Sequence, residues 1–167
     1  MSKTVLITGS SRGIGLGVAR RLKQNGYEII LHGKSQSDAL KKAQDELNAK
    51  ALIFDVANTD ECKAVLEDYT NTNPALWGIV LNAGITCDNT FVALEENEWK
   101  NVIDVNLNSF YNVLKPLLMP IIRQKAGRII VMSSVSGIIG NRGQSNYSAS
   151  KAGLIGASKA LAVELAS

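Results

Sequence analysis

The feature of this sequence that most constrains its fold is a regular alternation of short apolar runs with longer amphipathic stretches. The apolar runs are rich in β-branched residues and predict strands at 5–8, 27–33, 49–56, 77–84 and 127–134. Runs such as IIL and IIVM carry few polar residues, as expected of strands buried on both faces of a sheet. The alternation therefore predicts an α/β fold, a Rossmann-like doubly wound parallel sheet with helices on both faces.

The stretches between and after the strands predict helices at 15–26, 37–47, 59–70, 95–122 and 145–166. Ser37 and Thr59 stand at the start of two of these helices and are the expected N-caps. Pro116 and Pro120 lie inside the longest helix, where a bend or a break is expected because proline lacks an N–H. No repeat or low-complexity segment interrupts the pattern, so residues 1–167 are predicted to form one domain.

Composition argues against several classes of function. The chain has 18 basic and 15 acidic residues, a net charge of +3, and its basic residues form no run, so nucleic-acid binding is not expected. Cys62, Cys87 and the single histidine, His32, are too few for a structural zinc site, and no metal is expected. Two isolated cysteines are typical of a reducing compartment, and the apolar N-terminal run is too short for a signal peptide or a membrane span. We therefore expect a cytoplasmic protein without membrane contact.

The segment TGSSRGIG, residues 8–15, lies where the first predicted strand gives way to the first helix. Gly9, Gly13 and Gly15 permit a tight turn, the close approach of backbone to a pyrophosphate, and packing of the helix on the strand. The N-terminus of the helix offers free N–H groups and a partial positive charge to phosphates. A glycine-rich turn without a ligand is the alternative, but the position between a strand and a helix favours a dinucleotide site.

The end of the second predicted strand, LHGKS at 31–35, bears on the choice between NAD and NADP. Sites selective for NAD place an acidic residue here, which binds the ribose 2′-hydroxyl. This chain has Lys34 instead, and Arg12 lies in the glycine-rich loop. Two cations without a carboxylate suit the 2′-phosphate of NADP(H). An ordinary solvent-exposed charge is an equally good explanation of Lys34.

The segment NYSASKAG, residues 146–153, places Tyr147 and Lys151 four positions apart in the last predicted helix. This spacing puts both side chains on one face of the helix. A nearby ammonium favours the ionised form of a phenol, which would let Tyr147 exchange a proton near neutral pH. Taken alone, the spacing is more often that of a surface tyrosine packed along a lysine stem, so the rest of the chain has to decide.

With the glycine-rich loop and the Tyr–Lys pair both present, the chain resembles the short-chain dehydrogenases/reductases, and most of all their 3-oxoacyl-[acyl-carrier-protein] reductases. The family's motifs occur in order across the sequence, namely TGSSRGIG at 8–15, DV at 55–56, NAG at 82–84, Asn106, Ser134 and Tyr147-xxx-Lys151. One departure is Leu81, where many members carry an asparagine. Members of the family continue beyond position 167 with two more strands and a substrate-covering loop, so we expect this sequence to lack the last strands of the family fold.

The resemblance implies a role for each motif. Tyr147 gives a proton to the carbonyl oxygen of the substrate, and the Ser134 hydroxyl binds the same oxygen; the other serines of SSVS are expected to serve the turn or the packing. Lys151 holds the nicotinamide ribose, and Asn106 holds a water in the proton relay. The residues expected to bind the cofactor are Gly9, Ser10, Ser11, Arg12, Gly13, Ile14, Gly15, Lys34, Asp55, Val56, Asn82, Ala83, Gly84, Tyr147 and Lys151.

The implied activity is the NADPH-dependent reduction of a 3-oxoacyl thioester to the 3-hydroxyacyl thioester in fatty-acid biosynthesis, with acyl carrier protein as the partner. Carrier proteins are acidic, and a basic cluster of Arg123, Lys125 and Arg128 follows the longest helix. Capping of that helix by cations explains the cluster equally well. The resemblance and the apolar character of 95–122 and 146–166 predict a homo-oligomer, a tetramer as in relatives.

Other functions remain open at this point. The chain could reduce another ketone, such as acetoacetyl-CoA or a sugar or steroid carbonyl, or it could be an NADP-binding protein without turnover. A serine hydrolase is disfavoured, because His32 is the only candidate base and lies on the second predicted strand, remote from Ser134.

Overall fold

The computed structural model describes residues 3–166 and contains a sheet of five strands. The strands are β1 Thr4–Ile7, β2 Glu28–Gly33, β3 Lys50–Ile53, β4 Gly78–Leu81 and β5 Arg128–Val131. Neighbouring strands all pair in parallel, in the order β3-β2-β1-β4-β5. The chain therefore winds to one side of β1 through β2 and β3 and to the other side through β4 and β5. The predicted doubly wound parallel sheet is confirmed.

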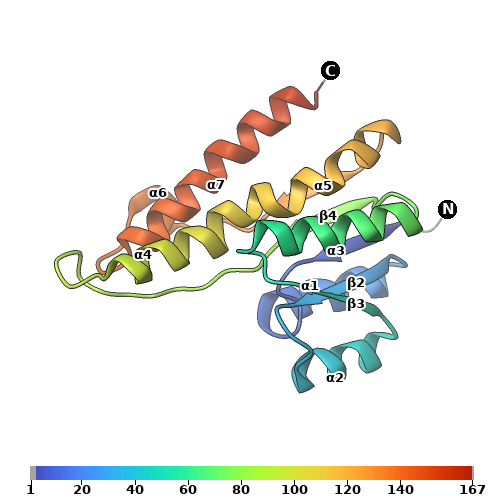
Figure 1. The fold of residues 1–167 in the computed structure, drawn as a ribbon, viewed down its shortest axis with the longest axis horizontal. Coiled ribbons are helices and arrows are strands. Elements are labelled where there is room, and N and C mark those ends of the chain that lie inside the picture. Colours follow the sequence, from blue (N-terminus) through green and yellow to red (C-terminus); the bar gives the residue numbers. More distant parts are fainter. Residues whose placement is uncertain (1–2, 167) are drawn as a thin grey trace.

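Helices cover both faces of the sheet, as Figure 1 shows. They are α1 Gly13–Gln24, α2 Asp38–Leu47, α3 Thr59–Thr72, α4 Glu96–Ile103, α5 Ser109–Arg123, α6 Ser136–Ile139 and α7 Ser145–Glu164. A π-helical turn, η1 Asp104–Asn108, joins α4 to α5. The sequence pattern predicted neither the short helix α6 nor the π-helical turn.

Each face of the sheet has its own hydrophobic core. On one face, Phe54 packs in a cluster with Leu66 of α3 and Leu117 of α5. On the other face, Leu31 of β2 packs in a second cluster with Leu40 of α2. Figure 1 shows α3 and α5 side by side on the first face, with α7 next to α5. Burial of these side chains supplies the main stabilisation of the sheet.

Burial on both faces holds for the central strands only. All the residues of β4 are buried, as are most of those in β1 and β2. The strands at the two edges, β3 and β5, are more exposed, and the side chain of Ile130 in β5 is 51% exposed. The expectation that the apolar runs are buried on both faces was therefore wrong for the edge strands, which have a neighbouring strand on one side only.

Helix starts follow local hydrogen bonding. The hydroxyl of Ser37 accepts the N–H of Leu40, so the predicted cap of α2 is confirmed. In α3 the cap is Asn58, whose side-chain oxygen accepts N–H groups of the first turn, and Thr59 is the first helical residue. The Thr59 hydroxyl instead donates to Asn112 of α5 at 2.9 Å. The prediction of Thr59 as the cap was wrong by one residue, since both residue types are good caps.

The long stretch 95–122 departs from regular α-helix at η1 rather than at its prolines. Helix α5 continues through both Pro116 and Pro120. Its buried residues Val113, Leu117 and Ile121 recur every four positions and pack into the core, which offsets the two hydrogen bonds that the prolines remove. The departure from regular α-helix therefore lies about two to three helical turns before Pro116, at the buried Asn106 of η1.

Among the described residues, 3–166, no helix is long and apolar enough to cross a membrane. The carboxyl ends of β1, β4 and β5 lie together at one edge of the parallel sheet. In open α/β sheets, ligands bind at this edge, beside the strand where the order changes direction. The motif residues follow these strand ends.

Candidate active site

The ends of β1 and β4 are joined by two side chains that follow them, Thr8 and Asn82. The Thr8 hydroxyl accepts the N–H groups of Asn82 and Ala83, each at 3.0 Å. The Asn82 amide donates in return to the carbonyls of Thr8, at 2.9 Å, and Gly9, at 3.1 Å. These bonds fix the start of the glycine-rich loop against the end of β4.

The glycines of the loop are favoured for different reasons, and Gly13, like Gly9, has a positive φ, +57°. Gly9 has φ +63°, and a Cβ there would lie 2.9 Å from Cα of Ala83. At Gly15, a Cβ would lie 2.4 Å from the Gly9 carbonyl oxygen. Gly9 therefore makes the turn and Gly15 lets α1 pack against it, which agrees with the roles expected from the sequence.

The N-terminus of α1 is suited to an anion. Arg12 is the N-cap residue, its side chain makes no capping bond, and the first turn contains no acidic residue. Arg12, Gly13 and Ile14 are all exposed. Uncapped N–H groups and the positive end of the helix dipole attract a phosphate group. The residues here fit the pyrophosphate of a dinucleotide, with the backbone N–H groups of the first turn as its ligands.

Ser10 and Ser11 differ within this loop. Ser10 is fully buried and its hydroxyl accepts the N–H of His32 at 2.9 Å, so this side chain holds the loop to β2. Ser11 is partly exposed. Of the two serines, Ser11 is the one whose side chain is exposed enough to meet a ligand.

Beyond β2, two residues expected to bind the cofactor contact each other. The Lys34 ammonium lies 2.7 Å from a carboxylate oxygen of Asp55, and the other oxygen accepts the N–H of Ala57. Partial burial opposes ionisation of Asp55, but the bonds from Lys34 and Ala57 outweigh it and hold its pKa below the ordinary value. The side chain of Lys34 is 77% exposed, so its ammonium remains within reach of a ligand. Val56 is buried, and its carbonyl accepts a bond from Asn112.

The Tyr–Lys pair lies in the first turns of α7. Lys151 is 5% exposed, and its ammonium donates to the carbonyl of Met132, after β5, at 2.8 Å. The same ammonium lies 5.6 Å from the ring centroid of Tyr147. Burial lowers the pKa of Lys151 from its ordinary value. Lys151 is thus a buried group held by a hydrogen bond to the backbone, and not a surface lysine packed along a tyrosine.

The serines after β5 have separate partners. The Ser133 hydroxyl donates to the Lys151 carbonyl at 2.8 Å, and the Ser136 hydroxyl donates to the side chain of Gln144 at 3.3 Å. Within residues 3–166, Ser134 accepts only the N–H of Ser136, at 3.2 Å, so its hydroxyl hydrogen is available to a substrate. This distribution agrees with the choice of Ser134 over its neighbours. A Cβ on Gly137 would lie 2.7 Å from the backbone of Lys151, so glycine there lets α6 approach α7.

Asn106 lies at the centre of η1 and is 1% exposed. Its side chain bonds both backbone groups of Ile85, accepting the N–H at 2.8 Å and donating to the carbonyl at 2.9 Å. It also donates to the Ser150 hydroxyl at 3.1 Å. A Cβ on Gly84 would meet Asn106 at 3.3 Å and the Lys151 ammonium at 3.5 Å. Asn106 therefore joins the segment after β4 to α7, next to the Tyr–Lys pair.

The segment after β4 is held to the start of α7 by further bonds. Asn146 is fully buried and donates to the Cys87 carbonyl at 3.0 Å. The side chain of Gln144 donates to Asp88 at 2.8 Å, and Asn89 donates its N–H to the Gly143 carbonyl at 2.8 Å. The candidate active site thus has a fixed wall, formed by residues that are remote from each other in sequence.

Sequence reasoning missed several residues that position this site. Thr8, Asn146 and Ser150 are buried polar side chains next to predicted site residues, and their bonds connect different elements. From the sequence, His32 was weighed as a metal ligand and as a base, yet both of its ring nitrogens are occupied by Gly9 and Phe54. Polar residues adjacent to a motif were the available signal, since buried polar groups need partners.

Comparison with known proteins agrees with this geometry. The sequence profile of the family described as short chain dehydrogenase matches residues 3–167. The chain is 55% identical, over 172 aligned positions, to the 3-oxoacyl-[acyl-carrier-protein] reductase FabG of Aggregatibacter actinomycetemcomitans. The alignment covers 99% of this chain and 71% of that protein.

Proteins with the same description from other bacteria are also similar, at lower identity. The chain is 40% identical to that of Staphylococcus aureus (strain N315), with 100% of this chain and 70% of the relative covered. It is 37% identical to that of Chlamydia muridarum (strain MoPn / Nigg), with 100% and 69% covered. Family membership implies a nicotinamide cofactor, which the glycine-rich loop fits. The chain belongs to the short-chain dehydrogenase family.

Proposed function

We propose that this chain catalyses the NADPH-dependent reduction of a 3-oxoacyl thioester, carried by acyl carrier protein, to the 3-hydroxyacyl thioester. The observation that carries the proposal is the placement of the buried Lys151 ammonium between the Tyr147 ring and the end of β5, at the edge of the sheet where the glycine-rich loop also lies. The substrate class follows from relatives named 3-oxoacyl-[acyl-carrier-protein] reductase. We place the activity in cytoplasmic fatty-acid synthesis.

The proposed chemistry requires one proton from the protein. NADPH, when bound, supplies the hydride for the carbonyl carbon. As negative charge develops on the carbonyl oxygen, the Tyr147 hydroxyl gives its proton to that oxygen. The Ser134 hydroxyl, whose hydrogen is not used within the fold, donates a hydrogen bond to the same oxygen. Donors aimed at a charge that appears only in the transition state raise the rate rather than merely the affinity.

The other two predicted catalytic residues act through position and charge. Lys151 keeps its ammonium close to the Tyr147 ring and stabilises the phenolate left after proton transfer. We assign to the same ammonium the contact with the nicotinamide ribose. Asn106 fixes the backbone of Ile85 beside Gly84 and the Tyr–Lys pair, and the water of the proton relay is proposed to lie there.

Preference for NADPH over NADH is proposed from charge. Arg12 is exposed at the start of α1, and Lys34 is exposed after β2. Among the described residues, Arg12 makes no ion pair, whereas Lys34 pairs with Asp55. A 2′-phosphate would therefore receive the free guanidinium directly, and would share the Lys34 ammonium with Asp55. We assign Asp55, Val56, Asn82, Ala83 and Gly84 to the adenosine side of the cofactor.

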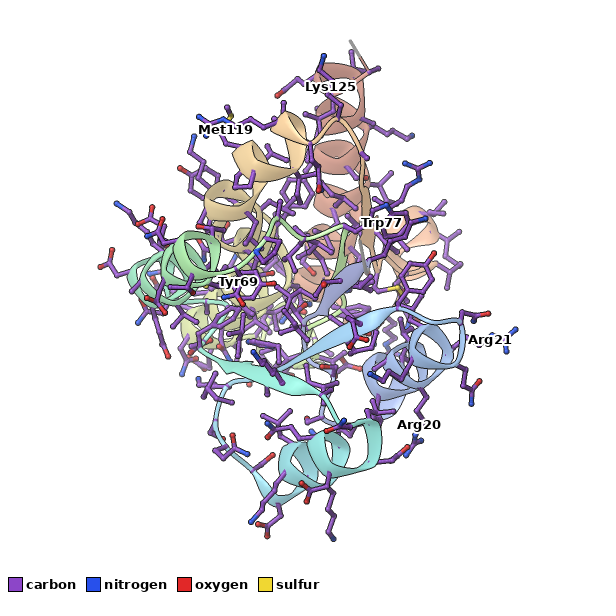
Figure 2. All side chains as sticks on the ribbon, turned by 90° about the vertical axis from the view of Figure 1, so that its right-hand side faces the viewer. Arg20, Arg21, Tyr69, Trp77, Met119 and Lys125 are labelled. Carbon is purple, nitrogen blue, oxygen red and sulfur yellow. The ribbon has the colours of Figure 1, made fainter. Side chains whose placement is uncertain are left out.

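Docking of the carrier protein is proposed at the end of α5. Figure 2 shows Lys125 at the outer end of this helix, beside α7 and far from Arg20 and Arg21 of α1. Lys125 has φ +53° and follows the last turn of α5, and Arg123 and Arg128 are exposed nearby in the chain. Exposed cations suit an acidic partner and act mainly on its rate of association.

We also propose that residues 1–167 act as one cofactor-binding domain and that copies of the protein assemble into a homotetramer. The support is the apolar exposed surface of α5 and α7, where Tyr111, Met119 and Val163 are 59%, 53% and 77% exposed. Large exposed apolar side chains are typical of helices that pack against another subunit.

The proposed function is tested by following NADPH consumption with three ketones, namely a 3-oxoacyl group on acyl carrier protein, the same group on CoA, and a small free ketone. We expect the carrier-linked substrate to give the highest kcat/KM. Faster turnover of CoA-linked or free ketone would assign the chain to another ketoreductase class. Tight NADPH binding without turnover of any ketone would make it a cofactor-binding protein without this activity.

A further inference from the structure

The buried side chain that the proposed mechanism does not use is His32, the only histidine of the chain. It lies in β2 and is 2% exposed. Its ring packs on the ring of Phe54, with the centroids 4.2 Å apart. A buried imidazole requires partners for both nitrogens, because an unpaired buried polar group is costly.

The two partners of the ring fix its protonation and its tautomer. Nδ1 lies 2.9 Å from the backbone nitrogen of Gly9, and an N–H can only donate. Nε2 lies 2.9 Å from the carbonyl oxygen of Phe54, which can only accept. The ring must therefore be neutral, with its hydrogen on Nε2 and an acceptor at Nδ1. Burial lowers the pKa of His32 to about 4, which agrees with a neutral ring near pH 7.

The backbone of His32 is bound to the same loop. The N–H of Ser10 donates to the His32 carbonyl at 3.1 Å, and the N–H of His32 donates to the Ser10 hydroxyl at 2.9 Å. Together with the ring, His32 makes three hydrogen bonds to two consecutive loop residues. Only the ring contact is a property of histidine, since the other bonds use its backbone.

The ring contact acts at the residue where the loop turns. Gly9 has φ +63°, and a Cβ there would lie 2.9 Å from Cα of Ala83, so there is little free space on that side. On the other side, Nδ1 of His32 accepts the N–H of Gly9 and so fixes the direction of that N–H. We propose that His32 is a positioning residue for the glycine-rich loop, and that its neutral Nδ1 orients Gly9 so that the following N–H groups can receive the cofactor's pyrophosphate. This inference rests on the proposed function in that the ligand is NADPH.

Two substitutions of His32 distinguish the hydrogen bond at Nδ1 from the one at Nε2. In His32→Asn, the side-chain oxygen lies at the place of Nδ1 and can still accept the Gly9 N–H, while the contact with Phe54 is lost. In His32→Gln, the longer side chain places its amide near Nε2 and keeps the contact with Phe54, while the acceptor for Gly9 is lost. Both remove a buried ring, so both are expected to lower stability.

The experiment measures the dissociation constant for NADPH by fluorescence titration at neutral pH, at a temperature where each variant is folded. We expect His32→Gln to bind NADPH about tenfold more weakly, because a buried N–H loses its acceptor, and His32→Asn to retain most of the affinity. Leu66→Ala, which removes a buried side chain of α3 from the core, serves as a control that lowers stability without touching the loop. It should leave the dissociation constant unchanged.

A second readout does not depend on the cofactor. Hydrogen exchange of the Gly9 amide should be faster in His32→Gln than in His32→Asn, and the ¹⁵N spectrum of the wild-type ring should show a neutral Nε2–H tautomer. Equal NADPH affinities for the Asn and Gln variants, or a ring protonated on Nδ1, would overturn the role of His32. Failure of the wild-type chain to bind NADPH at all would overturn the proposed function instead, while the exchange and ring measurements would still decide the inference about the loop.

Discussion

The cofactor region and the reducing region of this site are built in different ways. The glycine-rich loop owes its shape to backbone geometry at Gly9 and Gly15, within eight consecutive residues. Asn106, Ser134 and Lys151 come from three separate segments. Asn106 and Lys151 are placed by hydrogen bonds to residues about 20 positions away, and Ser134 accepts the N–H of Ser136 in its own turn. The first region is therefore sensitive to added side-chain atoms as well as to loss of the polar groups that hold the loop, whereas the second is sensitive mainly to the loss of individual polar groups.

The largest effect is expected from Tyr147→Phe. The substitution keeps the ring and its contact with Lys151 and removes only the hydroxyl that gives the proton. General acid catalysis contributes about 10²- to 10⁴-fold, so kcat should fall by at least that order. Titration should show an unchanged affinity for NADPH. A variant that retains most of the wild-type kcat would show that the reducing region does not depend on this group.

The next effect concerns the pH dependence of stability and comes from the cofactor region. The unfolded chain protonates His32 below its ordinary pKa of 6.5, whereas the folded protein does so only near 4. Between these values the unfolded state binds more protons, so stability is lost as the pH falls through this window. The loss from this group should reach about 3 kcal/mol.

Urea unfolding at a series of pH values measures this loss, with His32→Asn as the matched variant without a titrating ring. The charged groups around the ring are Asp55 after β3 and its partner Lys34, with Glu61 of α3 acting on Lys34. All three remain in the variant, so their contributions cancel in the comparison. Parallel stability curves for the two proteins would contradict a neutral buried His32.

Arg12→Ala tests the charge at the start of α1. Loss of a charge-assisted bond of about 1.5–3 kcal/mol should weaken NADPH binding by roughly ten- to a hundredfold. The affinity for NADH should change little, because NADH lacks the 2′-phosphate. Calorimetric titration with both cofactors measures the ratio, and wild-type protein that binds both equally would refute the proposed preference.

Substitution by alanine should have opposite effects at Gly15 and Gly17, which both lie in α1. Gly15→Ala would place a Cβ 2.4 Å from the Gly9 carbonyl and 2.5 Å from the Asn82 amide, so it should cost about 1–3 kcal/mol in stability and weaken NADPH binding. Gly17 has open space around its Cβ position, and Gly17→Ala should stabilise α1 by about 0.5–1 kcal/mol. Thermal unfolding and NADPH titration measure both. Equal effects at the two positions would contradict a loop shaped by close packing.

The smallest effect is expected at Lys125, in the proposed docking surface for the carrier protein. Lys125→Glu should raise the KM for a carrier-linked substrate several-fold at low salt, because a rim charge acts on association and is screened by salt. A small thioester analogue should be reduced at the wild-type rate. An equal change for both substrates, or for neither, would remove Lys125 from carrier docking.

The two regions also differ in how well the sequence predicted them. The glycine-rich loop and the shared helical face of Tyr147 and Lys151 depend on local spacing, and both were predicted correctly in position. The contact between Lys34 and Asp55 was not predicted, because it joins residues that follow two different strands. Local spacing cannot show which side chains meet across the sheet.

The same limit explains the π-helical turn and the role of His32. The turn at Asn106 accompanies hydrogen bonds to Ile85, which is 21 positions away. The bond between His32 and Gly9 spans 23 positions. The prolines of α5 gave a stronger local signal for a break, yet packing of its apolar face kept that helix continuous. Tertiary contacts outweighed local preference in each case.

The most direct test of the account follows the hydrogen that NADPH transfers. The chain would be given 3-oxoacyl-acyl carrier protein together with NADPH that carries deuterium at the transferable position, and the product would be analysed by mass spectrometry. We predict a 3-hydroxyacyl product with one deuterium on the carbon that bore the ketone, formed by wild-type protein and not at a comparable rate by Tyr147→Phe. Bound NADPH with no labelled product, or equally fast labelling by both proteins, would contradict the account.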